Sequence, residues 1–461
     1  MKISNTLVIS VGCLLTLTVL TSQAAVLDEI VVTAQKRDQS MQDVGIAVTA
    51  FSGDQLDQLG WTSAQQVTAM SPGVTTIQPN GPSSFFTNIR GVAQNDFSGD
   101  HQESPVAIYV DEAYVSAASG AGFQLFDFER VEILRGPQGT LFGRNATGGL
   151  VHYITRKPEQ AFDGYAEITI ADYNQRKLEG AVGGGLTENI SGRLAAVVNE
   201  YDGIYNNRNG KDLNNGDDWA VRGQLLFDIS DTMEWLVSVK AAEQDVNVAP
   251  FSHQSARLNP TTGLGEAFNG PDLTAVGDSR IANGYQPGSN SLLQGSVNVQ
   301  GFNRIETFGA TSNLKIALSD NVELVAVTDF AQLEKDYIED SDAGPNDFFA
   351  FSLRSDLDQF SQEIRLTSVN ETSTWVLGAY YLNIDGDFFN GGPASNFFAA
   401  AFPGFGLNDP SLVGLGLNNP FSTDTQSYAV FGQLEYDLTE SVRVTAGVRW
   451  SREEKDIDFR Q

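Results

Sequence analysis

The sequence predicts a mainly β fold in two parts: a small mixed α/β domain over residues 43–158, then an antiparallel transmembrane β-barrel over residues 159–461. Three observations predict it. Beyond residue 158, apolar and polar residues alternate with period two, as in strands with two different faces. Short polar links between these strands are separated by long irregular stretches. The N-terminus has the features of an export signal, yet no later apolar run is long enough for a helical membrane span.

Residues 1–24 are expected to be a signal peptide. Lys2 gives a basic start, Leu7–Leu20 is an apolar run, and Ser22–Ala24 offers small residues for cleavage before Ala25. Cys13 is the only cysteine and lies in this segment, so the mature chain would have no disulfide or thiol chemistry. A lipid anchor at Cys13 is the alternative, disfavoured because a long apolar stretch follows the cysteine. Export leaves a soluble secreted protein or an outer-membrane barrel, and only a barrel hides its spans from hydropathy.

The formal net charge of -30 argues against a nucleic-acid partner, which requires a basic surface. His101, His152 and His253 are far apart in the sequence and show no metal-ligand spacing. No nucleophile elbow or dinucleotide fingerprint is present either. We therefore expect neither an enzyme nor a cofactor or metal site.

Residues 43–158 carry the signals of the small α/β domain. Ser52 with Gln55 forms a capping box that opens a short helix, which Gly60 closes. Thr62 with Gln65 repeats the box for a second helix. Short apolar runs predict strands at 45–51, 74–77, 88–91, 106–110, 131–134 and 150–155.

The lengths of the connections favour a barrel over a soluble sandwich, which would also show alternating strands. Tyr428, Val430 and Leu434 share one face of a strand, with Ser427 and Glu435 on the other. Short links fall at 186–189, 229–232, 318–321, 369–372 and 438–441, and long stretches at 201–218, 246–303 and 386–424. Nothing in a sandwich fold separates short connections from long ones, whereas an outer-membrane barrel has short turns at one end and long loops at the other.

The most informative segment runs from Glu129 to Lys157, with a strand, a sharp corner, a glycine-rich crossing and a second strand. Pro137 fixes φ at the corner, while Gly136 and Gly139 allow backbone angles closed to other residues. Three further glycines suit close packing of backbone on backbone: Gly143, Gly148 and Gly149. Over its whole length the segment closely resembles the plug-domain signature of TonB-dependent outer-membrane receptors. A tight corner in an unrelated α+β domain is the alternative.

Residues 25–42 are expected to be a periplasmic leader. Within it, Asp28-Glu29-Ile30-Val31-Val32-Thr33-Ala34 resembles a TonB box, the segment that a periplasmic energy-coupling protein grips. The chemistry is suitable, because a short β-branched segment in a mobile arm can add as a strand to the edge of a partner's sheet.

The resemblance implies a barrel of about 22 strands around the plug. The chain contains about eleven, so we expect it to be truncated and to cover the plug and about half the barrel. A complete eleven-strand barrel is the alternative, disfavoured because bacterial single-chain barrels have even strand numbers.

The resemblance also assigns roles to residues of the plug. It implies that Arg90, next to Gly91, and Arg135 pair with barrel glutamates; the alternative is that each arginine caps local carbonyls. It implies ligand contacts from apical loops, for which we select Phe85, Phe86, Asn95 and Phe97. Two positions depart from the family pattern. Glu112 stands where glycine is common, which puts the geometry of that turn in doubt, and His152-Tyr153 replaces an aliphatic pair.

The implied function is TonB-dependent import of a scarce nutrient across the outer membrane of a Gram-negative bacterium. A ferric siderophore or similar iron complex is expected, because that is the family's commonest cargo. Cobalamin, haem, an oligosaccharide or an aromatic compound remain alternatives, as do a truncated relic that does not transport and an outer-membrane enzyme or adhesin. The implied partners are a TonB-type protein, outer-membrane lipid and a small-molecule ligand.

Overall fold

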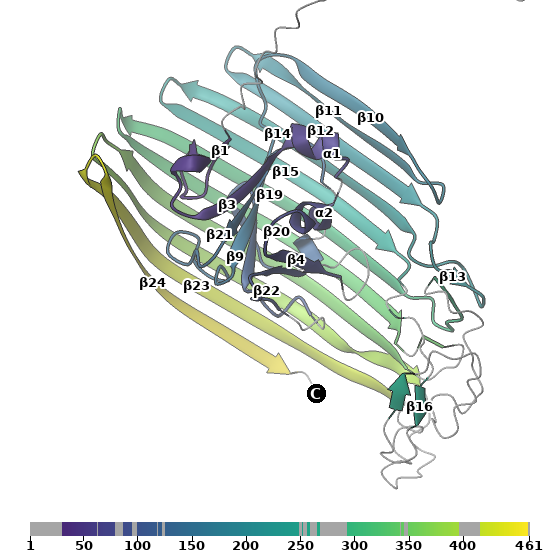
Figure 1. Cartoon of the computed structure of the whole chain (residues 1–461). Coiled ribbons are helices and arrows are strands. Elements are labelled where there is room, and N and C mark those ends of the chain that lie inside the picture. Colours follow the sequence, from purple (N-terminus) through teal and green to yellow (C-terminus); the bar gives the residue numbers. More distant parts are fainter. Residues whose placement is uncertain are drawn as a thin grey trace, which may run out of the picture.

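The computed structural model confirms the two-part, mainly β architecture. It describes residues 30–61, 63–78, 86–94, 99–117, 119–121, 125–248, 251, 256–258, 265–267, 293–341, 343–344, 349–395 and 415–459. A broad curved sheet forms one layer, and the small domain lies against its inner face (Figure 1). No helix within these residues is long and apolar enough to cross a membrane.

The small domain, called the plug from here on, has a five-stranded sheet in the order β3-β8-β9-β6-β7. Only the β6–β9 pair is parallel. Its elements are β3 (Ala47–Ser52), α1 (Gly53–Leu59), α2 (Ala64–Ala69), β4 (Val74–Ile77), β5 (Phe86–Ile89), β6 (Val106–Val110), β7 (Ala113–Val115), the 3-10 turn η2 (Ser119–Ala121), β8 (Phe128–Arg135) and β9 (Gly149–Thr155). One face of the sheet packs on both helices through Val131, Val151, Leu56 and Val67.

The expected capping boxes are present, one of them displaced by a residue. Ser52 and Gln55 cap α1, and Gly60 ends it in the left-handed conformation. The second box is formed by Ser63 and Gln66, so the expectation of Thr62 and Gln65 was wrong. With this box α2 begins at Ala64, and its Val67 is buried in the plug core.

The large sheet contains the eleven expected strands, all antiparallel to their neighbours. They are β10 (Asp163–Ile170), β11 (Arg176–Thr187), β12 (Ile190–Tyr201), β14 (Gly216–Ser230), β15 (Met233–Val246), β19 (Phe302–Ser319), β20 (Val322–Asp340), β21 (Ala350–Val369), β22 (Ser373–Ser395), β23 (Leu415–Thr439) and β24 (Val442–Phe459). Four short strands lie in the connections: β13 (Asn206–Asn207), β16 (Ala256–Leu258), β17 (Gly265–Ala267) and β18 (Gln294–Gly295).

The connections are sorted by length as expected. All five short links join neighbouring strands, and these turns gather at the end of the sheet opposite β13 and β16 (Figure 1). The expected long stretch at 386–424 is shorter, because β22 continues to Ser395 and β23 begins at Leu415. Alternation continues in this part, with Ile384 and Phe388 buried and Asp385 exposed.

The barrel wall has an inverted distribution of polarity. Tyr428, Val430 and Leu434 on one face of β23 are 43%, 52% and 45% exposed, while Ser427 and Glu435 on the other face are buried. A soluble sheet would bury the apolar face. An exposed apolar face with a covered polar face is the pattern of a strand between lipid and lumen.

Candidate functional site

The leader is folded against the plug and the wall rather than extended as a free arm. β1 (Val31–Val32) pairs with β2 (Gln39–Ser40), and the 3-10 turn η1 (Met41–Asp43) follows. Val32 and Ala34 are buried in the cluster shared by plug and barrel residues. The expectation of a mobile arm was therefore wrong for residues 30–42. Asp28 and Glu29 of the expected box lie outside the described residues.

Thr33, the penultimate residue of the box segment, is bonded to two plug strands. Its backbone N–H donates to the carboxylate of Glu132 on β8 at 2.8 Å, and its hydroxyl lies 3.4 Å from Nδ1 of His152 on β9. Burial raises the pKa of Glu132, although Arg130, 2.8 Å away, favours its charged form. Movement of Thr33 would therefore act directly on β8 and β9.

Lys36 connects the leader to the barrel wall. Its Nζ donates to Glu363 of β21 at 3.2 Å and lies 3.9 Å from Glu112 of the plug. The ammonium also sits over the ring of Phe142 at 4.8 Å, a cation–π contact. Arg37 adds a contact to Glu435 of β23 at 2.8 Å.

Glu112 lies in a tight turn whose backbone conformation is unfavourable for any residue other than glycine. Asp111 and Glu112 connect β6 to β7 with φ angles of 49° and 71°, both in the left-handed region. The turn therefore keeps its tight geometry without glycine. The Glu112 carboxylate accepts from Arg365 of β21 at 3.0 Å and faces Lys36. Burial alone would raise the pKa of Glu112, but Arg365 and Lys36 outweigh it and hold the pKa well below the ordinary carboxyl range.

His152 joins the turn to the leader. The backbone N–H of Glu112 donates to its Nε2 at 3.1 Å, so the proton of the neutral ring is on Nδ1, where it faces the Thr33 hydroxyl. Burial lowers the pKa of His152 to about 3, which keeps the ring neutral at physiological pH. This position, where the sequence departs from the family pattern, therefore forms a specific polar contact between three segments.

The signature corner requires glycine at most of the selected positions. A Cβ on Gly149 would lie 2.2 Å from the Leu134 carbonyl oxygen, and its φ is 144°. Positive φ also occurs at Gly91, Gly136 and Gly143, and an added Cβ on Gly148 would press on Val92 and Val106. Gly139 is the exception: its φ is not positive and its nearest neighbour would be 3.8 Å away, so that expectation was wrong. Pro137 is exposed at the corner.

Arg90 and Arg135 lie at the same corner and contact local groups. Arg135 donates to the carbonyl of Pro72 at 3.0 Å, and a guanidinium nitrogen of Arg90 would be 3.2 Å from a Cβ on Gly136. Neither forms an ion pair with a carboxylate of the described residues. Pairing with barrel glutamates stays a prediction, and for Arg135 the carbonyl contact matches the alternative.

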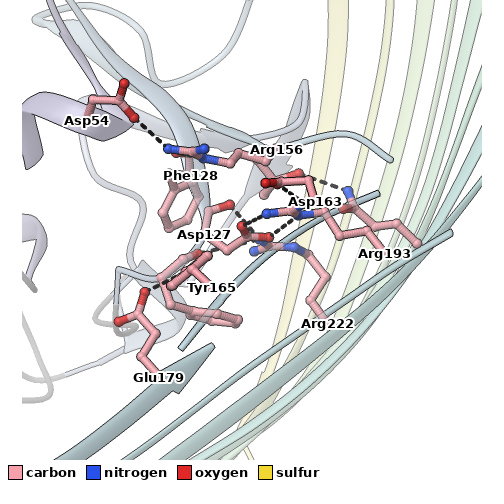
Figure 2. Close-up of polar contacts among 12 residues, drawn as sticks. Asp54, Asp127, Phe128, Arg156, Asp163, Tyr165, Glu179, Arg193 and Arg222 are labelled. Atoms are coloured by element: carbon pink, nitrogen blue, oxygen red, sulfur yellow. Dashed lines mark hydrogen bonds and ion pairs between the residues drawn. The ribbon is translucent and has the colours of Figure 1, made fainter. Parts of the chain in front are cut away.

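The plug is instead anchored by an acidic residue that the sequence analysis did not select. Asp127 is buried and accepts from Arg193 of β12 at 2.8 Å and from Arg222 of β14 at 3.1 Å (Figure 2). Arg222 also donates to the backbone carbonyl of Asp127 and lies over the ring of Phe126. Arg193 further contacts Asp163 of β10 at 2.9 Å. The alternation of apolar and polar residues along β14 could have predicted that Arg222 faces the inside of the barrel. No local sequence pattern, however, identifies Asp127 as an anchoring residue.

At the end of the plug near the long connections, Asp100 is buried against the wall. It lies 3.5 Å from Lys335 of β20, and its other oxygen accepts from the Ser119 N–H at 2.9 Å. Burial would raise the pKa of Asp100, but Lys335 and these hydrogen bonds lower it. Of the residues selected for ligand contact, Phe86 is buried in β5, and Phe85, Asn95 and Phe97 lie outside the described residues. No group of metal-ligating side chains occurs in the part of the chain that the structure describes.

Comparisons with known proteins agree with this architecture. Residues 40–150 match the family model described as TonB-dependent Receptor Plug Domain. Residues 245–461 match the model described as TonB dependent receptor-like, beta-barrel.

Curated relatives cover different parts of the chain. The pesticin receptor of Yersinia pestis is 32% identical over 36% of this chain and 25% of its own length. The rhizobactin receptor of Rhizobium meliloti is 24% identical over 92% of this chain and 55% of its own length. A vitamin B12 transporter of Photobacterium profundum is 26% identical over 38% of this chain and 28% of its own length. The chain thus spans about half the length, or less, of the curated relatives it matches.

The fold is that of a solved receptor. The ferric yersiniabactin uptake receptor of Yersinia pestis superimposes with a TM-score of 0.70 at 19% identity, over 90% of this chain and 57% of that one. The matches to both family models, together with the plug lying against an eleven-strand wall, lead to one conclusion. The chain belongs to the TonB-dependent receptor family.

Proposed function

We propose that this protein imports a scarce nutrient across the outer membrane of a Gram-negative bacterium, driven by a TonB-type protein in the periplasm. The observation that carries the proposal is the position of the leader. Its Thr33 is bonded to the plug strands β8 and β9, and its Lys36 to the wall strand β21. A pull on Asp28–Ala34 would therefore load the plug and release it from the wall in one movement.

The proposed cargo is a ferric siderophore or a similar iron complex. Support comes from the names of similar proteins, which are receptors for pesticin, for rhizobactin and for ferric yersiniabactin. The vitamin B12 transporter among the relatives favours cobalamin as the second candidate. The family and the structural neighbours are receptors or transporters, and we propose no enzymatic activity.

Roles for individual plug residues follow from this proposal. The corner around Arg90, Arg135 and Gly149 would keep the plug rigid while force is applied. The apical segments that contain Phe85, Phe86, Asn95 and Phe97 would face the ligand.

The cargo is tested by deleting the gene and measuring growth with single iron chelates or cobalamin as the limiting nutrient. Loss of growth on one ferric siderophore, restored by the gene, is the expected result. Normal growth on every iron chelate together with a defect on cobalamin would replace the siderophore by the second candidate.

Coupling is tested by deleting residues 28–34 from the whole protein. Uptake of the labelled cargo should be lost, while binding of the cargo to intact cells is retained. The matched control changes two exposed leader residues outside the box, Asp38→Ala with Gln42→Ala, and should transport normally. Uptake by the deletion variant at the control rate would refute the role of the segment.

A further inference from the structure

A cavity of about 110 Å³, called the wall pocket from here on, lies between the plug and the central strands of the barrel wall. On the plug side it is bounded by Ala113 of β7 and Phe128 of β8. On the wall side the neighbouring strands β14, β15, β19 and β20 all contribute to its lining. The wall pocket therefore exists only while the plug rests against the wall.

Small side chains of the wall create this pocket. Ala220, Ala242 and Thr307 lie directly opposite one another on β14, β15 and β19, and Ala331 of β20 extends the gap. A mostly apolar cavity of this order of size holds an aromatic ring or a short aliphatic group without water. Pockets that bury a drug-sized ligand are larger, at roughly 300–1,000 Å³. The molecule that fits is therefore a small one, and not an iron chelate.

Two cations lie side by side in the lining of the wall pocket. Arg222 of β14 is directly opposite Lys240 of β15. Arg222 forms all its hydrogen bonds through Nη2, to Asp127 and to the carbonyl of Phe126 (Figure 2). Its side chain is only 6% exposed, and its Nε has no hydrogen-bond partner among the described residues. Asp127 is also shared with Arg193, so its one negative charge faces two guanidinium groups.

Lys240 has no hydrogen bond or ion pair within the part of the chain that the structure describes. Gly309 makes room for it, because a Cβ on this glycine would lie 2.8 Å from Cε of Lys240. The carboxylate in the lining is Asp329, which accepts from the Thr311 hydroxyl at 2.8 Å. Like charges directly opposite on neighbouring strands repel each other. An anion between Arg222 and Lys240 would relieve this repulsion.

We propose that the wall pocket binds a small carboxylate with an apolar body, and that the bound molecule holds the plug against the wall. The hydrocarbon part lies among the alanines, and the carboxylate accepts from Lys240 and from Nε of Arg222, in charge-assisted hydrogen bonds. Because plug and wall both line the pocket, the ligand binds only the docked arrangement and stabilises it by mass action. The binding is independent of the proposed import function, and only the resulting inhibition of uptake rests on it.

Binding is tested on the whole purified protein in detergent, with benzoate as the probe. Benzoate should bind saturably and raise the denaturant concentration at the midpoint of unfolding. Benzamide has the same ring without the charge and should bind about tenfold more weakly. No saturable binding of benzoate would overturn the site. Binding that leaves the unfolding midpoint unchanged would overturn the hold on the plug.

The role of the ammonium is tested with Lys240→Met. Lys315→Met is the matched control, because Lys315 lines a different cavity between plug and wall. Lys240→Met should bind benzoate and benzamide alike, whereas Lys315→Met should keep the preference for benzoate. The same preference in both variants would overturn the proposed contact with Lys240.

A second pair of variants tests the pocket without changing a charge. Ala242→Phe fills the space and should abolish binding of benzoate. Val239→Phe, at an exposed position on the outer face of the same strand, should leave binding unchanged. Denaturation of both variants without ligand verifies that they are folded. Benzoate binding by folded Ala242→Phe with the affinity of Val239→Phe would overturn the location of the site.

The effect on transport is measured as energised uptake of labelled cargo by cells. Saturating benzoate should lower uptake several-fold for the wild type and for Lys315→Met, but not for Lys240→Met. Inhibition of equal size in all three would mean that benzoate acts on the energy supply of the cell, and would overturn the regulatory role. Absence of energised uptake without benzoate would overturn the proposed function, while binding to the purified protein would still support the site.

Discussion

Two of the charged clusters between the plug and the barrel wall differ in one respect. Asp127 with Arg193 and Arg222 connects plug and wall alone (Figure 2). Glu112 with Arg365 also includes Lys36 of the leader. The first cluster is complete whatever the leader does, whereas the second loses a cation when the leader leaves. The plug thus has a permanent anchor and a second contact that depends on the leader.

The largest effect is expected at the permanent anchor. Asp127→Ala leaves buried Arg222 without its carboxylate and Arg193 with Asp163 alone, which should lower the free energy of unfolding by about 3–5 kcal/mol. Chemical denaturation in detergent measures this loss. Asp54→Ala is the control, since it breaks the exposed pair with Arg156 and should cost about 1 kcal/mol or less. Equal losses of unfolding free energy for the two variants would show that Asp127 does not anchor the plug to the barrel wall.

The second effect is a pH dependence confined to the leader-dependent cluster. The imidazole of His152 takes up a proton at pH 6.5 when unfolded but only at about 3 when folded. The unfolded state therefore binds more protons between these values, so stability is complete above pH 6.5 and falls as the pH falls. Acidification to about pH 5 should cost about 2 kcal/mol. Glu112 does not contribute to the pH dependence between pH 6.5 and about 5. The ordinary pKa of its carboxyl group, 4.5, already lies below this range, and the folded state lowers it further.

The measurement compares unfolding of the wild type and of His152→Gln at about pH 7.5 and about pH 5. The variant should lose most of the extra acid sensitivity. Parallel behaviour of the two proteins would mean that another group is responsible.

A smaller effect is expected from the backbone of the turn at Glu112. Glu112→Ala and Glu112→Gly both remove the carboxylate, but only glycine relieves the left-handed φ of 71°. The glycine variant should therefore be more stable than the alanine variant by about 1–2 kcal/mol. If the alanine and glycine variants unfold at the same denaturant concentration, the left-handed backbone at residue 112 carries no strain. The contacts of the Glu112 side chain would then have no backbone strain to offset.

The smallest effect on stability is expected from Lys36→Met. Glu112 keeps Arg365, so the free energy of unfolding should change by about 1 kcal/mol. The leader, however, loses its bond to Glu363, and a spin label at the exposed residue 38 should become more mobile. An immobile label in this variant would show that β1 and Thr33 hold the leader without Lys36.

The sequence was sufficient wherever the controlling interactions were local. The eleven strands and five turns follow from alternation and short polar links, and Ser52, Gln55 and Gly60 mark both ends of α1. The second capping box was placed one residue too early because Thr62-Gln65 and Ser63-Gln66 overlap in the sequence and both match the same pattern.

Contacts between distant segments could not be predicted. Asp127 meets Arg193 and Arg222 across 66 and 95 residues, and alternation says only that these arginines face inward. The same limit applies to Thr33, whose partners Glu132 and His152 lie 99 and 119 residues away. Glu112 and His152 were noticed as departures from a family pattern, but their contacts with the leader appear only in three dimensions.

The sorting of connections by length has a practical consequence for work in living cells. Asn209 lies in a connection at the long-loop end and Glu188 in a tight turn at the opposite end, and both are exposed. An epitope inserted at residue 209 should be stained by antibody on intact bacteria, whereas the same epitope at residue 188 should be stained only after the envelope is permeabilised.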